Sequence, residues 1–188
     1  LSALKENNTN ETRVSITPES VKLFSRLGFE VLIEKGAGDL SGYQDSMYID
    51  FGAKIASRNE CLDADVSLCV RMPDNEDIKN LKPNSTLIGI LNPYDNKSQF
   101  SNLNAKKISS CCMELIPRIS RAQSMDVLSS QANLAGYRSV IDAAEQFGKA
   151  FPMMMTAAGR VNPAKVMILG VGVAGLQAIA TAKRLGAI

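Results

Sequence analysis

No histidine occurs among the 188 residues of the sequence. Imidazole is the commonest general base and the commonest metal ligand in proteins, so its absence excludes Ser-His and Cys-His nucleophiles and imidazole-based metal centres. An excess of charge of either sign is also missing, because 21 Lys and Arg residues stand against 19 Asp and Glu residues, a net charge of +2. Nucleic-acid binding usually needs a concentrated basic surface, and we therefore expect no nucleic-acid partner.

Cysteine is sparse, and its spacing carries no metal or disulfide signature. The four residues show no Cys-x-x-Cys spacing; they are Cys61, Cys69, Cys111 and Cys112. We expect neither a metal site nor a disulfide framework. The adjacent pair lies in an apolar, strand-like run, which predicts two small core residues.

Hydrophobic runs long enough to cross a membrane are lacking too. The most apolar stretch, residues 166–182, is interrupted by three glycines and by Gln177, whereas a bilayer requires about 20 apolar residues. The first eleven residues are polar and rich in asparagine, unlike a cleavable signal. We expect no transmembrane segment and a reducing compartment.

The composition that remains, 45% hydrophobic and 21% charged, is that of a globular protein. Thr17-Pro18-Glu19 is a helix start, and Gly28 ends that helix before a β-rich segment at residues 29–34. Further apolar segments follow at residues 65–70, 86–91 and 106–113. Polar stretches of helical length separate them, near residues 76–81 and 98–103. This alternation predicts a mostly parallel sheet covered by helices on both faces.

The character of the sequence changes near residues 115–130. Residues 127–151 contain no proline and keep apolar positions at helical spacing, which predicts a long helix linking two domains. Small side chains along this helix allow another helix to approach closely, in the core or at a subunit contact; they are Ala132, Ala135, Gly136, Ser139 and Ala143.

A glycine motif follows in a strand-turn-helix context. Residues 165–169 predict a buried strand, which runs into Gly170-Val171-Gly172-Val173-Ala174-Gly175 and then a helix ending at Arg184. In such a turn the first glycine permits the bend, the second admits a pyrophosphate, and the third lets helix pack on strand. The helix N-terminus offers free N–H groups to the phosphates. The alternative is a tight turn without a ligand.

These patterns predict an α/β protein with two domains with parallel sheets, at residues 1–127 and 128–188, of which the second begins with a Rossmann-type glycine turn. An acidic residue that grips the adenine ribose is expected about 20 residues beyond the glycine turn, past Ile188. We therefore expect the second domain to be incomplete in this chain, which would be a fragment or half of a split subunit.

A polar loop lies between the two predicted domains. Residues 117–126, Pro-Arg-Ile-Ser-Arg-Ala-Gln-Ser-Met-Asp, combine cationic, amide and carboxylate groups after a strand end. Loops at the carboxyl ends of strands are where α/β domains bind ligands. The alternative is a capping loop, in which Asp126 caps the long helix and Arg118 and Arg121 are solvated.

The loop also carries a family resemblance. PRISRAQSMDVLSSQANLAGYRSVIDAA, FPMMMTAAG and GVGVAGLQAIATAKRLGA, with NETRVSITPESV near the start, closely resemble the α subunit of proton-translocating NAD(P) transhydrogenases. The resemblance covers essentially the whole chain. It implies an extramembranous NAD(H)-binding component that forms a homodimer, with the nucleotide in the cleft between two Rossmann-like domains.

The resemblance implies roles for individual residues. The polar loop would hold the nicotinamide end of NADH through Arg118, Gln123, Asp126 and Ser129, with Gln123 and Asp126 positioning the ring. The pyrophosphate turn would comprise Gly170, Val171, Gly172, Val173 and Gly175. Within the loop, Gln123 can hydrogen-bond a carboxamide, while Arg118 and Asp126 can pair. Hydride transfer between nicotinamides needs no general base, provided that the two reacting carbons are held ~3–3.5 Å apart.

The resemblance also implies partners. An NADP(H)-binding component would accept the hydride, and a separate membrane-spanning component would couple the transfer to proton movement. The expected location is peripheral, at the cytoplasmic face of a bacterial inner membrane or on the matrix side of a mitochondrial one.

The sequence leaves three rival functions open. Alanine dehydrogenases share the architecture and the start seen here at residues 12–18, but they use a lysine and a histidine. The corresponding strands, residues 69–73 and 89–93, offer an arginine and no histidine, so Arg13 is better interpreted as a structural ion-pair residue. The second rival is a non-catalytic dimerisation or docking fragment, and the third is an NAD-responsive regulatory domain.

Overall fold

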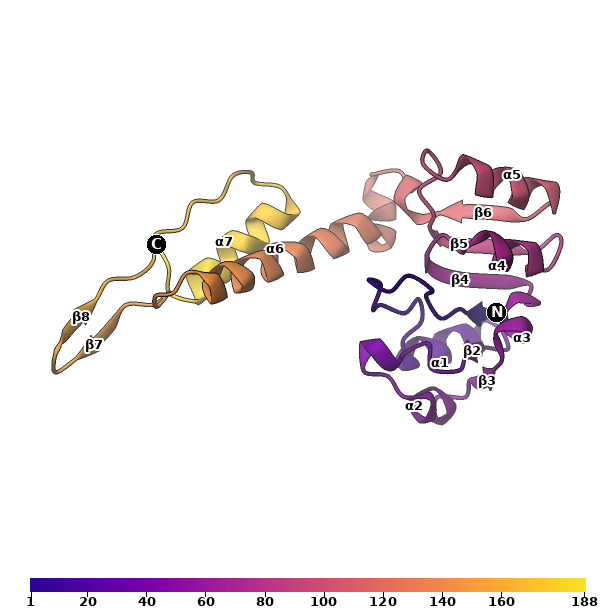
Figure 1. Cartoon of the computed structure of the whole chain (residues 1–188), viewed down its shortest axis with the longest axis horizontal. Helices are drawn as coiled ribbons and strands as arrows, with labels where there is room; N and C mark the ends of the chain where they lie inside the picture. The colour runs from indigo at the N-terminus through magenta and orange to yellow at the C-terminus, as the bar shows by residue number, and fades with distance from the viewer. The chain divides into compact units, whose positions relative to one another are not determined.

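The computed structural model describes all 188 residues, which form two compact units, Leu1–Pro117 and Arg118–Ile188. Figure 1 shows both units with their elements labelled. Each has its own hydrophobic core.

The N-terminal unit is built on a six-stranded sheet in the order β3-β2-β1-β4-β5-β6. All neighbouring strands are parallel. The strands are β1 Ser2–Ala3, β2 Leu32–Glu34, β3 Lys54–Ala56, β4 Val66–Arg71, β5 Thr86–Ile90 and β6 Ser109–Cys112. The chain winds from β1 outward to β3 and then returns to the other side of β1, so the strand order reverses between β1 and β4. Open α/β sheets bind ligands at such a reversal.

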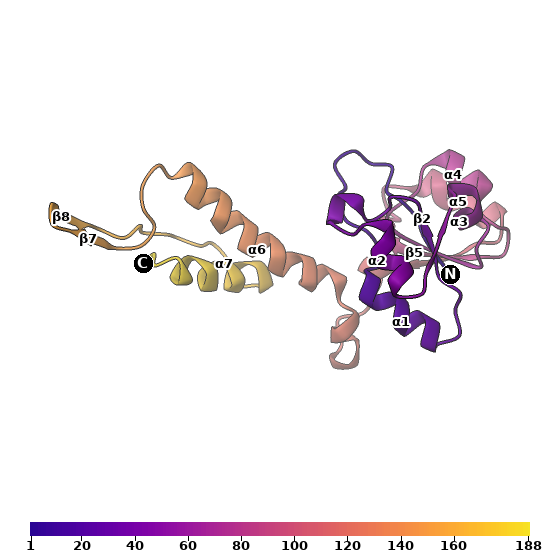
Figure 2. The ribbon, with the colours of Figure 1, turned by 90° about the horizontal axis from the view of Figure 1, so that it is seen from below.

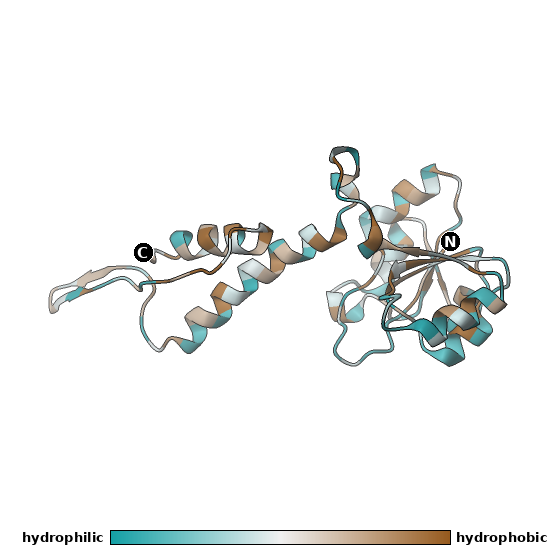
Figure 3. Ribbon diagram, turned by 90° about the horizontal axis from the view of Figure 1, so that it is seen from above, coloured by the Kyte–Doolittle hydropathy of each residue, from teal (hydrophilic) through white to brown (hydrophobic).

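Helices cover the sheet from both sides. They are α1 Pro18–Arg26, α2 Asp45–Asp50, α3 Arg58–Leu62, α4 Asn75–Asn80 and α5 Lys97–Ala105, with short 3-10 turns η1 Asp39–Ser41 and η2 Met113–Leu115. In Figure 2, α3, α4 and α5 gather on one side of the sheet and α1 lies on the other. The side chains between them form two cores, one around Leu62, Ile78 and Leu103 and one around Val21 and Tyr48. Figure 3 shows hydrophobic strands beneath the more hydrophilic outer surfaces of these helices.

Local sequence explains where these helices begin. Pro18 occupies the first turn of α1, where its missing N–H costs nothing. The Ser57 side chain accepts from the Glu60 N–H while the Glu60 carboxylate accepts from the Ser57 N–H, a capping box at the start of α3. The Asp74 carboxylate caps α4. The caps at Ser57 and Asp74 fix the loops that precede α3 and α4.

The predicted strands at residues 65–70, 86–91 and 106–113 correspond to β4, β5 and β6, which confirms the parallel α/β class. The sequence did not predict β1, although Ser2 and Ala3 are fully buried. The expectation of two core cysteines at the adjacent pair is wrong for Cys111, which is exposed, and Cys112 is half-buried. Cys112 packs against the core that lies under α3, α4 and α5, and because side chains alternate along a strand, Cys111 points to the opposite face of the edge strand β6.

The C-terminal unit contains two long helices and a hairpin. Its elements are η3 Ser120–Met125, α6 Val127–Gln146, β7 Met154–Thr156, β8 Gly159–Val161 and α7 Val173–Arg184. The predicted long helix is therefore present and ends at Gln146, and the antiparallel β7-β8 hairpin was not predicted. A core that includes Val140 and Ala178 joins α6 to α7. No helix of the chain combines the length and the apolar character that crossing a bilayer requires.

The predicted buried strand at residues 165–169 is not part of a sheet, and Met167 and Leu169 are largely exposed. The backbone N–H and C=O groups of a strand need partners on a neighbouring strand. The residue that pairs beside this segment is Ile188. The Val166 N–H donates to the Ile188 carbonyl at 2.7 Å, and the Ile188 N–H donates to the Ala164 carbonyl at 2.8 Å. This alternation is a parallel pairing, so the chain returns beside the segment after α7, as in a βαβ unit.

Candidate functional site

The glycine turn before α7 has room for a side chain at Gly172 but none at Gly175. Gly170 has a φ of +105°, which side chains other than glycine rarely adopt. Gly172 is the N-cap of α7, and a β-carbon placed there would have no atom within 4 Å. A β-carbon at Gly175 would lie 2.1 Å from the Gly170 carbonyl oxygen. The three glycines thus provide a bend, an open approach and a close helix contact.

The N-terminus of α7 has backbone N–H groups that no side chain caps. The helix is 12 residues long, and no side chain caps its first turn. Its first N–H groups therefore lack intrahelical acceptors and carry the positive end of the helix dipole. Val171 and Val173, on either side of Gly172, are 75% and 42% exposed. This combination suits an anionic group such as a phosphate.

The polar loop forms the 3-10 turn η3 and the start of α6. Ala122 is buried and anchors the turn, while Gln123, Arg118 and Arg121 are exposed. The backbone N–H of Asp126 donates to the Gln123 carbonyl at 3.2 Å. The Gln123 amide is therefore held on an ordered turn and faces solvent.

Asp126 is the N-cap of α6, and its side-chain partner is Ser129. Its carboxylate accepts from the Ser129 N–H at 2.9 Å and from the Ser129 hydroxyl at 2.7 Å. These two bonds lower the pKa of Asp126, and the more distant charge of Arg118 adds to the effect. The direct pair expected between Arg118 and Asp126 is not formed. The C-terminal unit thus brings Asp126 and Ser129 together, with Gln123 one turn before them.

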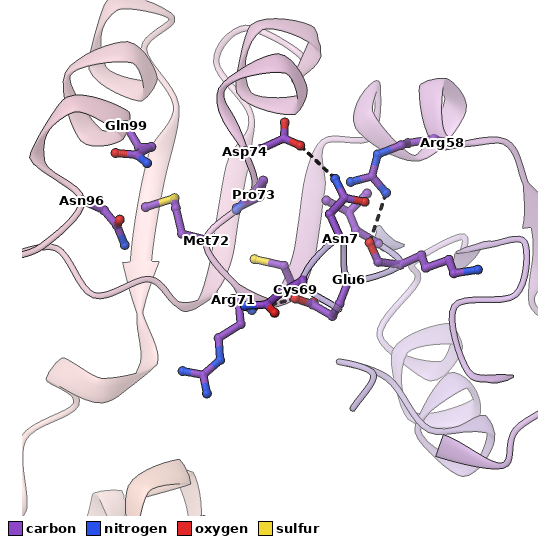
Figure 4. A pocket seen from close by; sticks show the side chains of 13 residues that line it. Glu6, Asn7, Arg58, Cys69, Arg71, Met72, Pro73, Asp74, Asn96 and Gln99 are labelled. Atoms are coloured by element: carbon purple, nitrogen blue, oxygen red, sulfur yellow. Dashed lines mark hydrogen bonds between the residues drawn. The ribbon is translucent and has the colours of Figure 1, made fainter. Parts of the chain in front are cut away.

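The N-terminal unit has a cleft of its own, which the sequence did not predict. It measures about 440 Å³ and lies where the strand order reverses. Figure 4 shows its side chains, which come from the loop after β1, from β4 and the loop that follows it, and from the starts of α3 and α5. Among them are Glu6, Asn7, Arg58, Arg71, Met72 and Gln99. Because these segments are far apart in the chain, no local pattern could have indicated the cleft.

Much of the polar lining of this cleft is already paired within the protein. Arg58 binds the carboxylates of Glu34, at 2.8 Å, and of Asp77. The Asn7 amide donates to Asp77 at 2.9 Å and to Asp74 at 3.1 Å, the latter visible in Figure 4. These bonds tie the loop after β1 to the starts of α3 and α4, so this network holds the architecture of the cleft.

A buried carboxylate joins two arginines at the edge of the same cleft. Glu11 is 7% exposed and contacts Arg13 at 2.7 Å and Arg71 at 3.0 Å. The hydrogen bonds from Arg13 lower the pKa of Glu11 to about 2. The predicted ion pair of Arg13 is thereby confirmed.

Acid is expected to weaken the fold through Glu11. Its folded pKa of about 2 lies below the ordinary value of 4.5, so its stabilisation is complete above pH 4.5 and is lost as the pH falls toward 2. Glu11→Gln should lower the melting temperature at pH 7 and flatten the acid dependence between pH 5 and pH 2. Melting curves across that range would measure both effects.

Glu30→Gln is the matched control, because Glu30 forms an exposed pair with Lys54, 63% and 69% exposed. Exposed pairs contribute little to stability. Identical acid profiles for the two variants would contradict the role of Glu11.

Comparison with known proteins places the chain in a family. The family model "Alanine dehydrogenase/PNT, N-terminal domain" matches residues 2–135, and "Alanine dehydrogenase/PNT, C-terminal domain" matches residues 139–188. The first part of the NAD(P) transhydrogenase subunit alpha of Rhodospirillum rubrum is 51% identical over 98% of this chain and 50% of its own length.

Two solved structures agree with this match. The transhydrogenase from Sinorhizobium meliloti superposes with a TM-score of 0.97 at 50% identity, over 100% of this chain and 56% of that one. An L-alanine dehydrogenase superposes with a TM-score of 0.85 at 26% identity, over 100% of this chain and 53% of that one. The chain spans about half the length of these relatives. The chain belongs to the alanine dehydrogenase/PNT family.

Proposed function

We propose that this chain is part of the NAD(H)-binding component of a proton-translocating transhydrogenase, in which hydride passes directly between NADH and NADP⁺. The observation that carries the proposal is the glycine turn, with an uncapped helix N-terminus and open space at Gly172. Support comes from the similarity to proteins named as NAD(P) transhydrogenase alpha subunits.

The residues of the C-terminal unit fit a dinucleotide. The backbone N–H groups around Gly172 would receive the pyrophosphate, and Val171 and Val173 would flank it. In the polar loop, the exposed Gln123 amide can bond a carboxamide, and Asp126 with Ser129 fixes the start of α6 beside it. Arg118 adds a positive charge to the same loop.

Positioning is the chemical task of these residues. Bound NADH supplies the hydride, and no side chain has to give or take a proton. Gln123 and Asp126 therefore orient the nicotinamide ring and do not act as acid or base. A reaction limited by placement suits a chain without histidine.

The proposal includes partners outside this chain. A separate NADP(H)-binding component accepts the hydride, and a membrane-spanning component couples the transfer to proton translocation. We also propose that the subunit forms a homodimer and docks peripherally on the membrane complex, at the cytoplasmic face in bacteria or the matrix side in mitochondria.

Titration of the complete natural subunit with NADH tests the proposal. The expected result is a saturable change in NADH fluorescence, followed by NADPH formation once the NADP(H)-binding component and NADP⁺ are added. Absence of any saturable change would favour a docking fragment. Saturable binding without turnover in the reconstituted complex would favour an NAD-responsive regulatory domain.

Gln123→Asn is expected to slow hydride transfer by about tenfold or more, because it withdraws the amide from the carboxamide and misplaces the ring. NADH affinity should stay within a few fold of the parent, since the phosphate contacts are untouched. Stopped-flow transfer rates and NADH titrations measure the two effects. Ser124→Ala, at the adjacent exposed position of η3, is the control, and equal rates for the two variants would refute the assignment.

A further inference from the structure

The two helices of the C-terminal unit approach each other most closely at one glycine. A β-carbon at Gly136 of α6 would lie 2.1 Å from the carbonyl oxygen of Ala174 in α7, and 2.8 and 2.9 Å from its carbonyl carbon and Cα. These are backbone atoms, which cannot rotate away as a side chain can. Only glycine permits this contact, and Gly136 is buried in it.

The contact fixes the register of two helices that run in the same direction. Ala174 lies against Gly136, and one and two turns later Ala178 and Ala182 join Val140 in the same buried cluster. Figures 1 and 2 both show α7 beside the C-terminal half of α6, with its first turn toward the beginning of α6.

The same contact connects the two parts of the proposed site. Asp126, in the polar loop, is the N-cap of α6, and Gly172, in the glycine turn, is the N-cap of α7. Asp126 and Gly136 are ten residues apart, about 15 Å along the helix axis. Gly172 precedes Ala174, so along the axis of α6 the turn lies on the loop's side of Gly136.

We propose that Gly136 is a positioning residue for hydride transfer, because it seats the first turn of α7 on α6 and so sets the spacing between the phosphate turn and the nicotinamide loop. The inference rests on the proposed function. A side chain at this position separates the helices and shifts the turn relative to the loop. A displacement of 1 Å at a reacting centre can lower the rate by about 100-fold.

Gly136→Ala tests this role, with Gly186→Ala as the matched control. A β-carbon at Gly186 would lie 2.8 and 2.9 Å from Pro152 atoms, and its φ is +85°. Gly186 therefore disturbs the same unit, but beyond the C-terminal end of α7 and away from the turn. Both variants should lower the melting temperature. In the complete subunit assayed with its NADP(H)-binding component below that temperature, only Gly136→Ala should lower kcat, by about tenfold or more.

Ligand fragments separate positioning from a general loss of structure. ADP-ribose contains the pyrophosphate but no nicotinamide, so its affinity should stay within about threefold in Gly136→Ala while the affinity for NADH falls by about tenfold. If Gly136→Ala does not fold, Val140→Leu crowds the same interface one turn farther from the glycine turn, and it should lower kcat by a smaller factor.

A Gly136→Ala protein with the kcat and the NADH to ADP-ribose affinity ratio of Gly186→Ala would overturn the inference, as would a folded Val140→Leu protein with unchanged kcat. A parent protein that binds no NADH would instead overturn the proposed function, and this role with it.

Discussion

Gly172→Ala is expected to raise the Kd for NADH by about tenfold or more while the chain keeps its fold. Gly172 has φ −74° and ψ −175°, which alanine adopts without strain, and its β-carbon would meet nothing within 4 Å. Loss of glycine at the N-cap should cost less than about 1 kcal/mol of stability. The added methyl group would nevertheless occupy the space through which a pyrophosphate approaches the backbone.

Gly175→Ala is expected to lower the stability of the fold, which Gly172→Ala leaves nearly unchanged. It is therefore the informative counterpart. Its β-carbon would lie 2.1 Å from the Gly170 carbonyl oxygen, so the turn must open before the helix can pack. Overpacking of this kind costs about 1–3 kcal/mol. Melting curves and NADH fluorescence titrations on both variants separate the two roles. Unchanged NADH affinity in Gly172→Ala would exclude the glycine turn as the phosphate site.

The glycine turn could be predicted from sequence because the demands on Gly170 and Gly175, a positive φ and a close contact between these two residues, arise within six residues. The same holds for Asp126, whose capping partner Ser129 is three positions away. Local sequence patterns of the same kind also predicted α1, β4 and β5. They did not separate the capping role of Asp126 from a ligand-binding one, since both use the same carboxylate.

Features that depend on distant neighbours were not accessible from sequence. β1 has only two residues, and it is a strand because β2 and β4 flank it on both sides. Cys111 lies in a segment that the sequence correctly predicts as a strand, yet it is exposed on the edge strand β6. Hydrophobic periodicity indicates which side chains a segment can bury. The position of its strand in the sheet decides whether they are buried.

Arg58→Met is expected to destabilise the N-terminal unit by about 3 kcal/mol or more at pH 7. Arg58 is the common partner of Glu34 and Asp77, whose side chains are 11% and 7% exposed. Methionine restores most of the volume but leaves two nearly buried carboxylates facing each other without a counter-charge. Removing one partner of a buried ionic network usually costs 3–5 kcal/mol, roughly, because the remaining charges stay desolvated. Urea unfolding monitored by circular dichroism measures the loss.

A second substitution distinguishes lost charge from lost packing. In the double variant Arg58→Met/Asp77→Asn a neutral amide replaces one of the two nearly buried carboxylates, so the repulsion that Arg58 balanced is removed. The double variant should then be destabilised less, relative to the parent, than Arg58→Met alone. Lys82→Met removes a pair with Asp65 that is 41% and 84% exposed and should cost under about 1 kcal/mol. A double variant that is no more stable than Arg58→Met would mean that packing, and not the ionic network, holds the loops of the cleft together.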